Sequence, residues 1–178
     1  MIRKKYSRDY QTETVLIKGG KKTVVSYTGP YYRFAAPEAT VKRMKAVFSV
    51  LSALSTGVWL AMLLQNVRLQ ARSWMLLFPL VFCTPVVLYE LMGLWRLVTA
   101  KQRVTREHSD KLFGRLRAVG LIQAALGALT LAGAVAMTAS NPFSVRSLLL
   151  CIGAAIWAGC GAARFALSRH LKMEPEEA

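Results

Sequence analysis

The stretch AVFSVLSALSTGVWLAMLLQ, residues 46–65, decides the fold of this chain. It carries no charged side chain, and its length matches the roughly 20 apolar residues that a helix needs to cross a bilayer core of about 30 Å. A buried helix of a soluble domain seldom shows so long an uncharged run. The stretch therefore predicts a transmembrane helix.

Three more apolar segments follow this one along the chain. Two of them contain a charged residue that would lie inside the membrane, which is Glu90 in the second segment and Arg164 near the end of the fourth. The chain is 54% hydrophobic and yet has a net charge of +15, so its charges and its apolar residues must occupy different places. We expect an all-α integral membrane protein with four transmembrane helices at residues 46–65, 73–97, 118–140 and 147–167.

The positions of the basic residues predict the orientation of these helices. Of the 24 Lys and Arg residues, all but Arg68, Arg72 and Arg146 fall on the side that holds both chain ends and the long middle connection. Lys and Arg near span ends are enriched on the cytoplasmic side of membrane proteins. This bias predicts N-in/C-in topology, with both termini cytoplasmic, in a bacterial inner membrane or an equivalent plasma membrane.

The predicted organisation has three parts, which are a basic cytoplasmic N-terminal segment at residues 1–44, the membrane domain at 45–170 and a cytoplasmic tail at 171–178. The first part contains TETVLIKGGKKTVVSY, residues 12–27, with two runs rich in Val and Thr on either side of Gly19 and Gly20. Two glycines between such runs are typical of a β-hairpin turn. A turn there would place Val15 opposite Val24 and Lys18 opposite Lys21.

Glu90 is the residue that most needs an explanation. A charged side chain at the centre of a membrane helix costs about 2.5 to 3.5 kcal/mol, and less toward the ends. Glu90 must therefore pair with a cation, reach the headgroup layer or titrate as part of a transport path. The predicted topology places both Arg164 and Arg117 in the same depth zone of the membrane as Glu90. Arg164 is the better candidate because it lies about one helical turn deeper than Arg169. We favour an ion pair between Glu90 and Arg164 that ties the second span to the fourth.

Small residues recur every four positions in the third span and again in the fourth. Helices in a bilayer associate through close packing, and small residues allow their backbones to approach. We therefore expect the third and fourth spans to pack as an antiparallel pair through these positions. The predicted packing residues are Gly120, Ala124, Ala128, Ala132 and Ala136 in the third span, and Ala155, Gly159 and Ala163 in the fourth.

Pro79 and Pro85 lie within the second span. A proline removes one backbone donor and bends or loosens a helix. The two residues are therefore candidates for a hinge, although a bent helix that fits its neighbours is the more frequent outcome.

Residues typical of catalysis or metal binding are sparse. His108 and His170 have no carboxylate or cysteine at ligand spacing, and no glycine-rich phosphate loop occurs. The sequence predicts no enzyme activity, no metal and no cofactor. Its basic residues favour contact with anionic lipid headgroups, whereas nucleic acid is disfavoured because no stacking platform or known binding motif is present.

These patterns predict a noncatalytic accessory or interaction subunit with a basic cytoplasmic face, which contacts lipid and either a protein partner or a second copy of itself. The alternative is a small transporter or channel component that uses Glu90 in a kinked second span.

Overall fold

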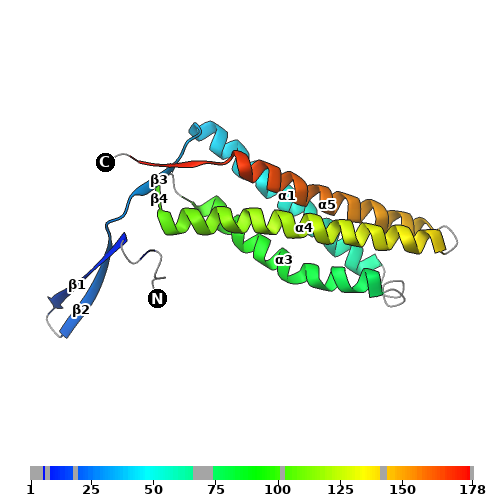
Figure 1. The fold of residues 1–178 in the computed structure, drawn as a ribbon, viewed down its shortest axis with the longest axis horizontal. Helices are drawn as coiled ribbons and strands as arrows, with labels where there is room; N and C mark the ends of the chain where they lie inside the picture. The colour runs from blue at the N-terminus through cyan, green and yellow to red at the C-terminus, as the bar shows by residue number, and fades with distance from the viewer. Residues whose placement is uncertain are drawn as a thin grey trace.

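The computed structural model describes residues 6, 9–17, 20–65, 74–100, 103–140 and 144–176. Within them, four long helices form an up-and-down bundle (Figure 1). Each helix contains a segment long and apolar enough to cross a membrane, as the sequence predicts. Their bounds are α1 Glu38–Gln65, α3 Trp74–Thr99, α4 Arg106–Ser140 and α5 Val145–His170.

The helices extend beyond the predicted spans, mainly at the end of the bundle that holds both chain ends. α1 begins directly after Pro37, whose carbonyl accepts a hydrogen bond from the Val41 amide at 3.0 Å. α4 begins at Arg106, well before residue 118 where the span was predicted to begin. α5 begins after Ser144, whose side chain caps the helix by accepting from the Arg146 amide at 3.3 Å.

Two apolar clusters fill the interior of the bundle, one toward each end. The cluster near the chain ends includes Phe48, Leu97, Leu112 and Leu171. The other includes Trp59, Leu80, Ala154 and Trp157. On each helix at least one buried polar residue lies between the residues of these two clusters, so a polar layer separates two apolar cores. These residues include Ser52 and Ser55 on α1, Glu90 on α3, Gln123 on α4 and Arg164 on α5.

A small sheet lies at the end of the bundle where the chain begins and finishes (Figure 1). Its central strand, β3 Tyr31–Phe34, pairs antiparallel with β4 Arg103–Thr105 on one side and with β5 Met173–Pro175 on the other. The segment before α1, the connection between α3 and α4 and the tail after α5 are therefore joined. Arg103 and Glu176 add an ion pair at 2.7 Å.

The predicted N-terminal hairpin is present as strands β1 Tyr10–Ile17 and β2 Gly20–Tyr27, but the predicted register is wrong by two positions. Val15 pairs with Lys22 and not with Val24, and Ile17 pairs with Gly20. This register brings Tyr10 opposite Tyr27, and the two rings pack edge to face with their centroids 5.1 Å apart. A cross-strand aromatic pair stabilises a hairpin. A shift by two also keeps each residue on its predicted face.

Candidate functional site

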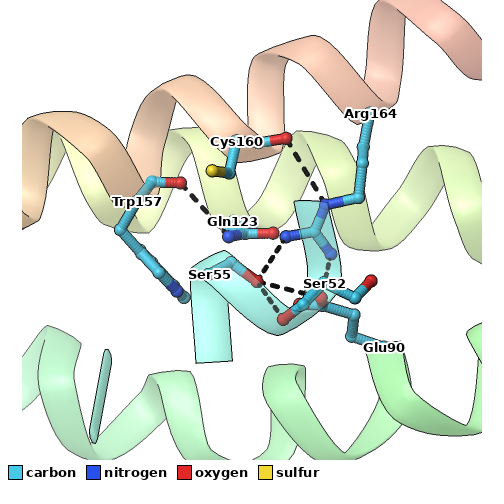
Figure 2. Close-up of polar contacts among 7 residues, drawn as sticks. All are labelled: Ser52, Ser55, Glu90, Gln123, Trp157, Cys160 and Arg164. Carbon is cyan, nitrogen blue, oxygen red and sulfur yellow. Dashed lines mark hydrogen bonds and ion pairs between the residues drawn. The ribbon is translucent and has the colours of Figure 1, made fainter. Parts of the chain in front are cut away.

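The polar layer between the two cores is the candidate site (Figure 2). It combines Glu90 from α3 and Arg164 from α5 with Ser52 and Ser55 from α1 and Gln123 from α4. All five side chains are buried, with exposed fractions of 3% or less. Each of the four helices therefore contributes a polar group to one layer.

Arg164 and Glu90 form an ion pair through the Arg164 Nη1 and Glu90 Oε1 atoms, and both side chains are only 3% exposed. The structure thus brings together Glu90 and Arg164, the pair that the sequence favours. Arg164 faces inward because it belongs to a buried row on α5 that alternates steps of three and four residues. This row is Ser147, Leu150, Ala154, Trp157, Gly161, Arg164 and Ser168.

Ser55 joins the ion pair to α1. Its hydroxyl accepts a hydrogen bond from Arg164 Nη2 at 2.7 Å and lies 3.0 Å from Glu90 Oε1 and 3.1 Å from the Ser52 carbonyl, to either of which it can donate (Figure 2). Arg164 Nε donates to the Cys160 carbonyl one turn earlier on α5, at 3.4 Å. The guanidinium group is therefore fixed by three different residues, and it links α1, α3 and α5.

The energetic role of this arrangement follows from its burial. Each charge alone would be costly inside a bilayer, and pairing offsets part of that cost because each side chain neutralises and hydrogen-bonds the other. Removing one partner would leave the other buried and unpaired. The ion pair therefore links the helices, and the Glu90 carboxylate is held by the Arg164 guanidinium group and the Ser55 hydroxyl.

Gln123 forms a second polar link in the layer, between α4 and α5. Its Nε2 atom donates to the Trp157 carbonyl at 3.1 Å, and the whole residue is buried (Figure 2). Sequence reasoning missed both Gln123 and Ser55. The signal for Gln123 was available, since it is the one amide side chain in the predicted third span. Ser55 lies three residues after Ser52, which is the spacing of a shared helix face.

α4 and α5 make the most extensive helix contact in the bundle, and glycines bring them together. A Cβ atom added at Gly161 would lie 2.6 Å from the Ala124 nitrogen, and one at Gly127 would lie 2.7 Å from the Ala158 Cα. One added at Gly120 would lie 2.9 Å from the Phe165 nitrogen. No side chain fits at these three positions without moving a backbone.

The predicted four-residue rows describe this contact only in part. Gly120 is buried and Ala124 and Ala163 are half-buried, but the other predicted residues are exposed on the bundle surface, and for them the prediction is wrong. A step of four residues advances about 40° beyond one full turn, so a strict four-residue row winds around the helix and leaves the contact. The exposed residues are Ala128, Ala132, Ala136, Ala155 and Gly159.

Pro79 and Pro85 both lie inside α3, which is continuous from Trp74 to Thr99. Pro79 is fully buried, whereas Pro85 is exposed on the bundle surface. The Leu80 carbonyl, next to Pro79, accepts a hydrogen bond from the Trp59 indole of α1 at 3.4 Å. This part of α3 is thus attached to α1, and the two prolines remain hinge candidates.

The five side chains of the layer offer charge and hydrogen bonding. Among the described residues, no group of three or more His, Cys, Asp or Glu side chains is placed to hold a metal ion. The three cysteines are free thiols, and Cys83 and Cys160 are buried. Comparison with protein-family models, with curated proteins and with solved structures gave no match to this chain.

Proposed function

We propose that this protein is a noncatalytic accessory or interaction subunit. Its four helices anchor it in a bacterial inner membrane or an equivalent plasma membrane, and it engages a protein partner through the ribbon formed by β1 and β2. Both termini and the small sheet lie in the cytoplasm in this proposal. The exposed ribbon is the observation that carries it.

The ribbon projects away from the helical bundle (Figure 1). At its base, the Tyr10 hydroxyl donates to Glu107 Oε2 at 3.1 Å, and the Tyr27 hydroxyl accepts from the Arg106 amide at 3.1 Å. Beyond this base the described side chains are exposed on both strands, among them Gln11 and Thr12 on β1 and Val24 and Val25 on β2. Among the described side chains, the ribbon is therefore attached to the start of α4 at its base.

An isolated two-stranded ribbon is marginally stable in water. No third strand pairs with β1 or β2 among the residues that the structure describes, so both ribbon edges offer backbone donors and acceptors. Exposed valines on one strand add apolar surface, since Val24 is 43% and Val25 50% exposed. Proteins commonly recognise such edges by adding a strand of their own. These features support a protein partner at the ribbon.

The cytoplasmic assignment rests on charge. The sheet end of the bundle holds most of the basic residues, whereas Arg146 lies at the start of α5, at the opposite end. Basic residues next to a span favour the cytoplasmic side and attract anionic headgroups. Of the three basic residues in the first turns of α1, Lys42 pairs with Glu38 and Lys45 donates to the Ala100 carbonyl at 2.7 Å, which leaves exposed Arg43 for lipid contact.

The competing function is transport through Glu90. A transported ion or proton needs a carboxylate that it can reach and that can change its state. Glu90 is 3% exposed and its Oε1 atom is held by Arg164 and Ser55. These contacts favour a structural carboxylate over a carrier, and a flux assay in liposomes with Glu90→Gln separates the two roles.

Photo-crosslinking in living cells tests the proposed ribbon interface. A photoreactive amino acid at Val25 on the ribbon should give a discrete adduct with one protein, because the side chain is exposed at the proposed contact. The matched control is Val50, which is 66% exposed on the apolar surface of α1 and should give only lipid adducts. Equal patterns at both positions, or flux that depends on Glu90, would overturn the proposal.

A further inference from the structure

A small cavity lies beside the ion pair, where all four helices meet. Its lining includes Ser52 of α1, Glu90 and Gly93 of α3, Arg115 and Leu116 of α4, and Arg164 of α5. Its volume of about 10 Å³ matches the space that one water molecule needs, which is on the order of 10 to 15 Å³.

Apart from Arg164 Nη1, which lies against Glu90 Oε1 in the ion pair, two buried charged atoms in the lining of this cavity have no hydrogen-bond partner among the described residues. They are Glu90 Oε2, the carboxylate oxygen that Ser55 does not contact, and Arg115 Nη1. A buried charged atom without a partner costs more than the loss of an ordinary hydrogen bond. Two such atoms of opposite character, one an acceptor and one a donor, therefore point to something that satisfies both.

Arg115 is held beside the cavity by a neighbour on α3. Its guanidinium carbon lies 4.9 Å from the centre of the Tyr89 ring, next to Glu90 in the sequence. No direct ion pair joins Arg115 to Glu90 among the described contacts, although both side chains line the same small space. A single molecule that accepts from arginine and donates to carboxylate would complete the contact.

We infer that the cavity binds one water molecule, which accepts a hydrogen bond from Arg115 Nη1 and donates one to Glu90 Oε2. The carboxylate then has two cations, Arg164 in direct contact through Oε1 and Arg115 through the water. Buried waters typically make two to four hydrogen bonds, and the Ser52 and Arg164 side chains supply further polar groups in the lining. The water connects α4 to the ion pair and the Ser55 hydroxyl, which link α1, α3 and α5.

The substitution Gly93→Ala tests this inference because it adds a methyl group at the cavity wall without a clash. The nearest atom to a Cβ at Gly93 is Leu116 Cδ2 at 3.9 Å. In a dry cavity, the methyl would fill empty space and alanine would also favour the helix, so the melting temperature would rise. In a hydrated cavity, the methyl would displace the water and leave Glu90 Oε2 and Arg115 Nη1 without partners.

The matched control is Gly159→Ala on α5, where a Cβ has no neighbour within 4 Å. We expect Gly93→Ala to melt about 4 °C below Gly159→Ala in detergent, which is the scale of one or two lost hydrogen bonds for a chain of this size. A melting temperature of Gly93→Ala equal to that of the control, or higher, would overturn the inference.

A structure of the wild type at high resolution gives a second, independent readout. We expect density for one solvent molecule at about 2.7 to 3.2 Å from both Glu90 Oε2 and Arg115 Nη1. An empty cavity, or direct contact between the Glu90 and Arg115 side chains, would contradict the proposed water.

Discussion

Glu90 on α3 and Arg164 on α5 form an ion pair in which both side chains are almost completely buried. The whole of α4 lies between them in the sequence, so the contact forms only when α3 and α5 have come together. Ser55 extends it to α1. Its stability consequences can be tested by changing one partner or both.

Replacing one partner should be more harmful than replacing both. Glu90→Leu leaves the Arg164 charge buried without its carboxylate, and we expect a loss of roughly 3 to 5 kcal/mol of unfolding free energy. The double variant Glu90→Leu with Arg164→Met should recover most of this loss, because neither charge of the ion pair is left without its partner and Ser55 keeps the Ser52 carbonyl as acceptor. Thermal unfolding in detergent measures both effects.

The control for this series is Arg146→Met, which removes an exposed arginine from the start of α5. An exposed position of this kind typically changes stability by about 0.5 kcal/mol or less. If the double variant were less stable than either single variant, the ion pair would not be the main role of the two residues.

Two glycines on α5 should respond in opposite ways to the same substitution. Gly161→Ala forces a Cβ atom toward the Ala124 backbone nitrogen, at 2.6 Å in the present geometry, so α4 and α5 must separate. We expect a loss of about 1 to 3 kcal/mol, which is typical of overpacking. Gly159→Ala meets no atom within 4 Å and should be neutral or slightly stabilising. Equal effects at the two positions would exclude close backbone contact at Gly161.

The proposed orientation predicts which end of the bundle faces the cytoplasm. In a variant without Cys83, Cys151 and Cys160, a single cysteine at Arg146 should react with a membrane-impermeant maleimide in intact cells. A single cysteine at Glu174, an exposed residue of β5, should react only after the cells are permeabilised. The reverse pattern would contradict the positive-inside assignment.

The attachment of the ribbon should fail at high pH. Burial, followed by the hydrogen bond to Glu107, raises the pKa of Tyr10 above its usual value of 10.0. Since only the neutral phenol can donate to Glu107, the contact is present below pH 10 and is lost as the pH rises through the raised pKa. Tyr10→Phe should therefore remove one late step from the tyrosinate absorbance titration.

The same variant should also increase hydrogen exchange in β1 at neutral pH, because the base of the ribbon loses one of its bonds to α4. Tyr31→Phe is a suitable control, since Tyr31 is 44% exposed. Unchanged exchange in Tyr10→Phe would show that the Glu107 contact does not hold the ribbon.

The helices were predictable from the sequence because a long apolar run has few alternatives to a membrane helix. The sequence also narrowed the choice of cation that pairs with Glu90. A charge in lipid is costly unless it is paired, and the predicted topology puts few basic residues at the depth of Glu90. The exact packing face of α4 was harder to predict. Small residues recur at both three and four positions in this helix, and only the contact with α5 selects the row that contains Gly120 and Gly127.

Local sequence patterns could not predict the sheet formed by β3, β4 and β5, or the register of the ribbon. Strands β4 and β5 are only 3 residues long, and their pairing with β3 depends on where the four helices deliver the chain. The hairpin register was mispredicted because a pair of glycines identifies a turn without fixing which residues flank it. The Tyr10 and Tyr27 pairing, a contact between strand ends, selects the observed register.

Strand β3 has an implication for biogenesis. It is synthesised before any of the helices, but one of its two partners, β5, leaves the ribosome only after α5. The sheet can therefore close only once every helix has been inserted and has returned the chain to the starting side. Closure of this sheet would report complete insertion, so a chain arrested partway would expose an unpaired edge to quality-control proteases.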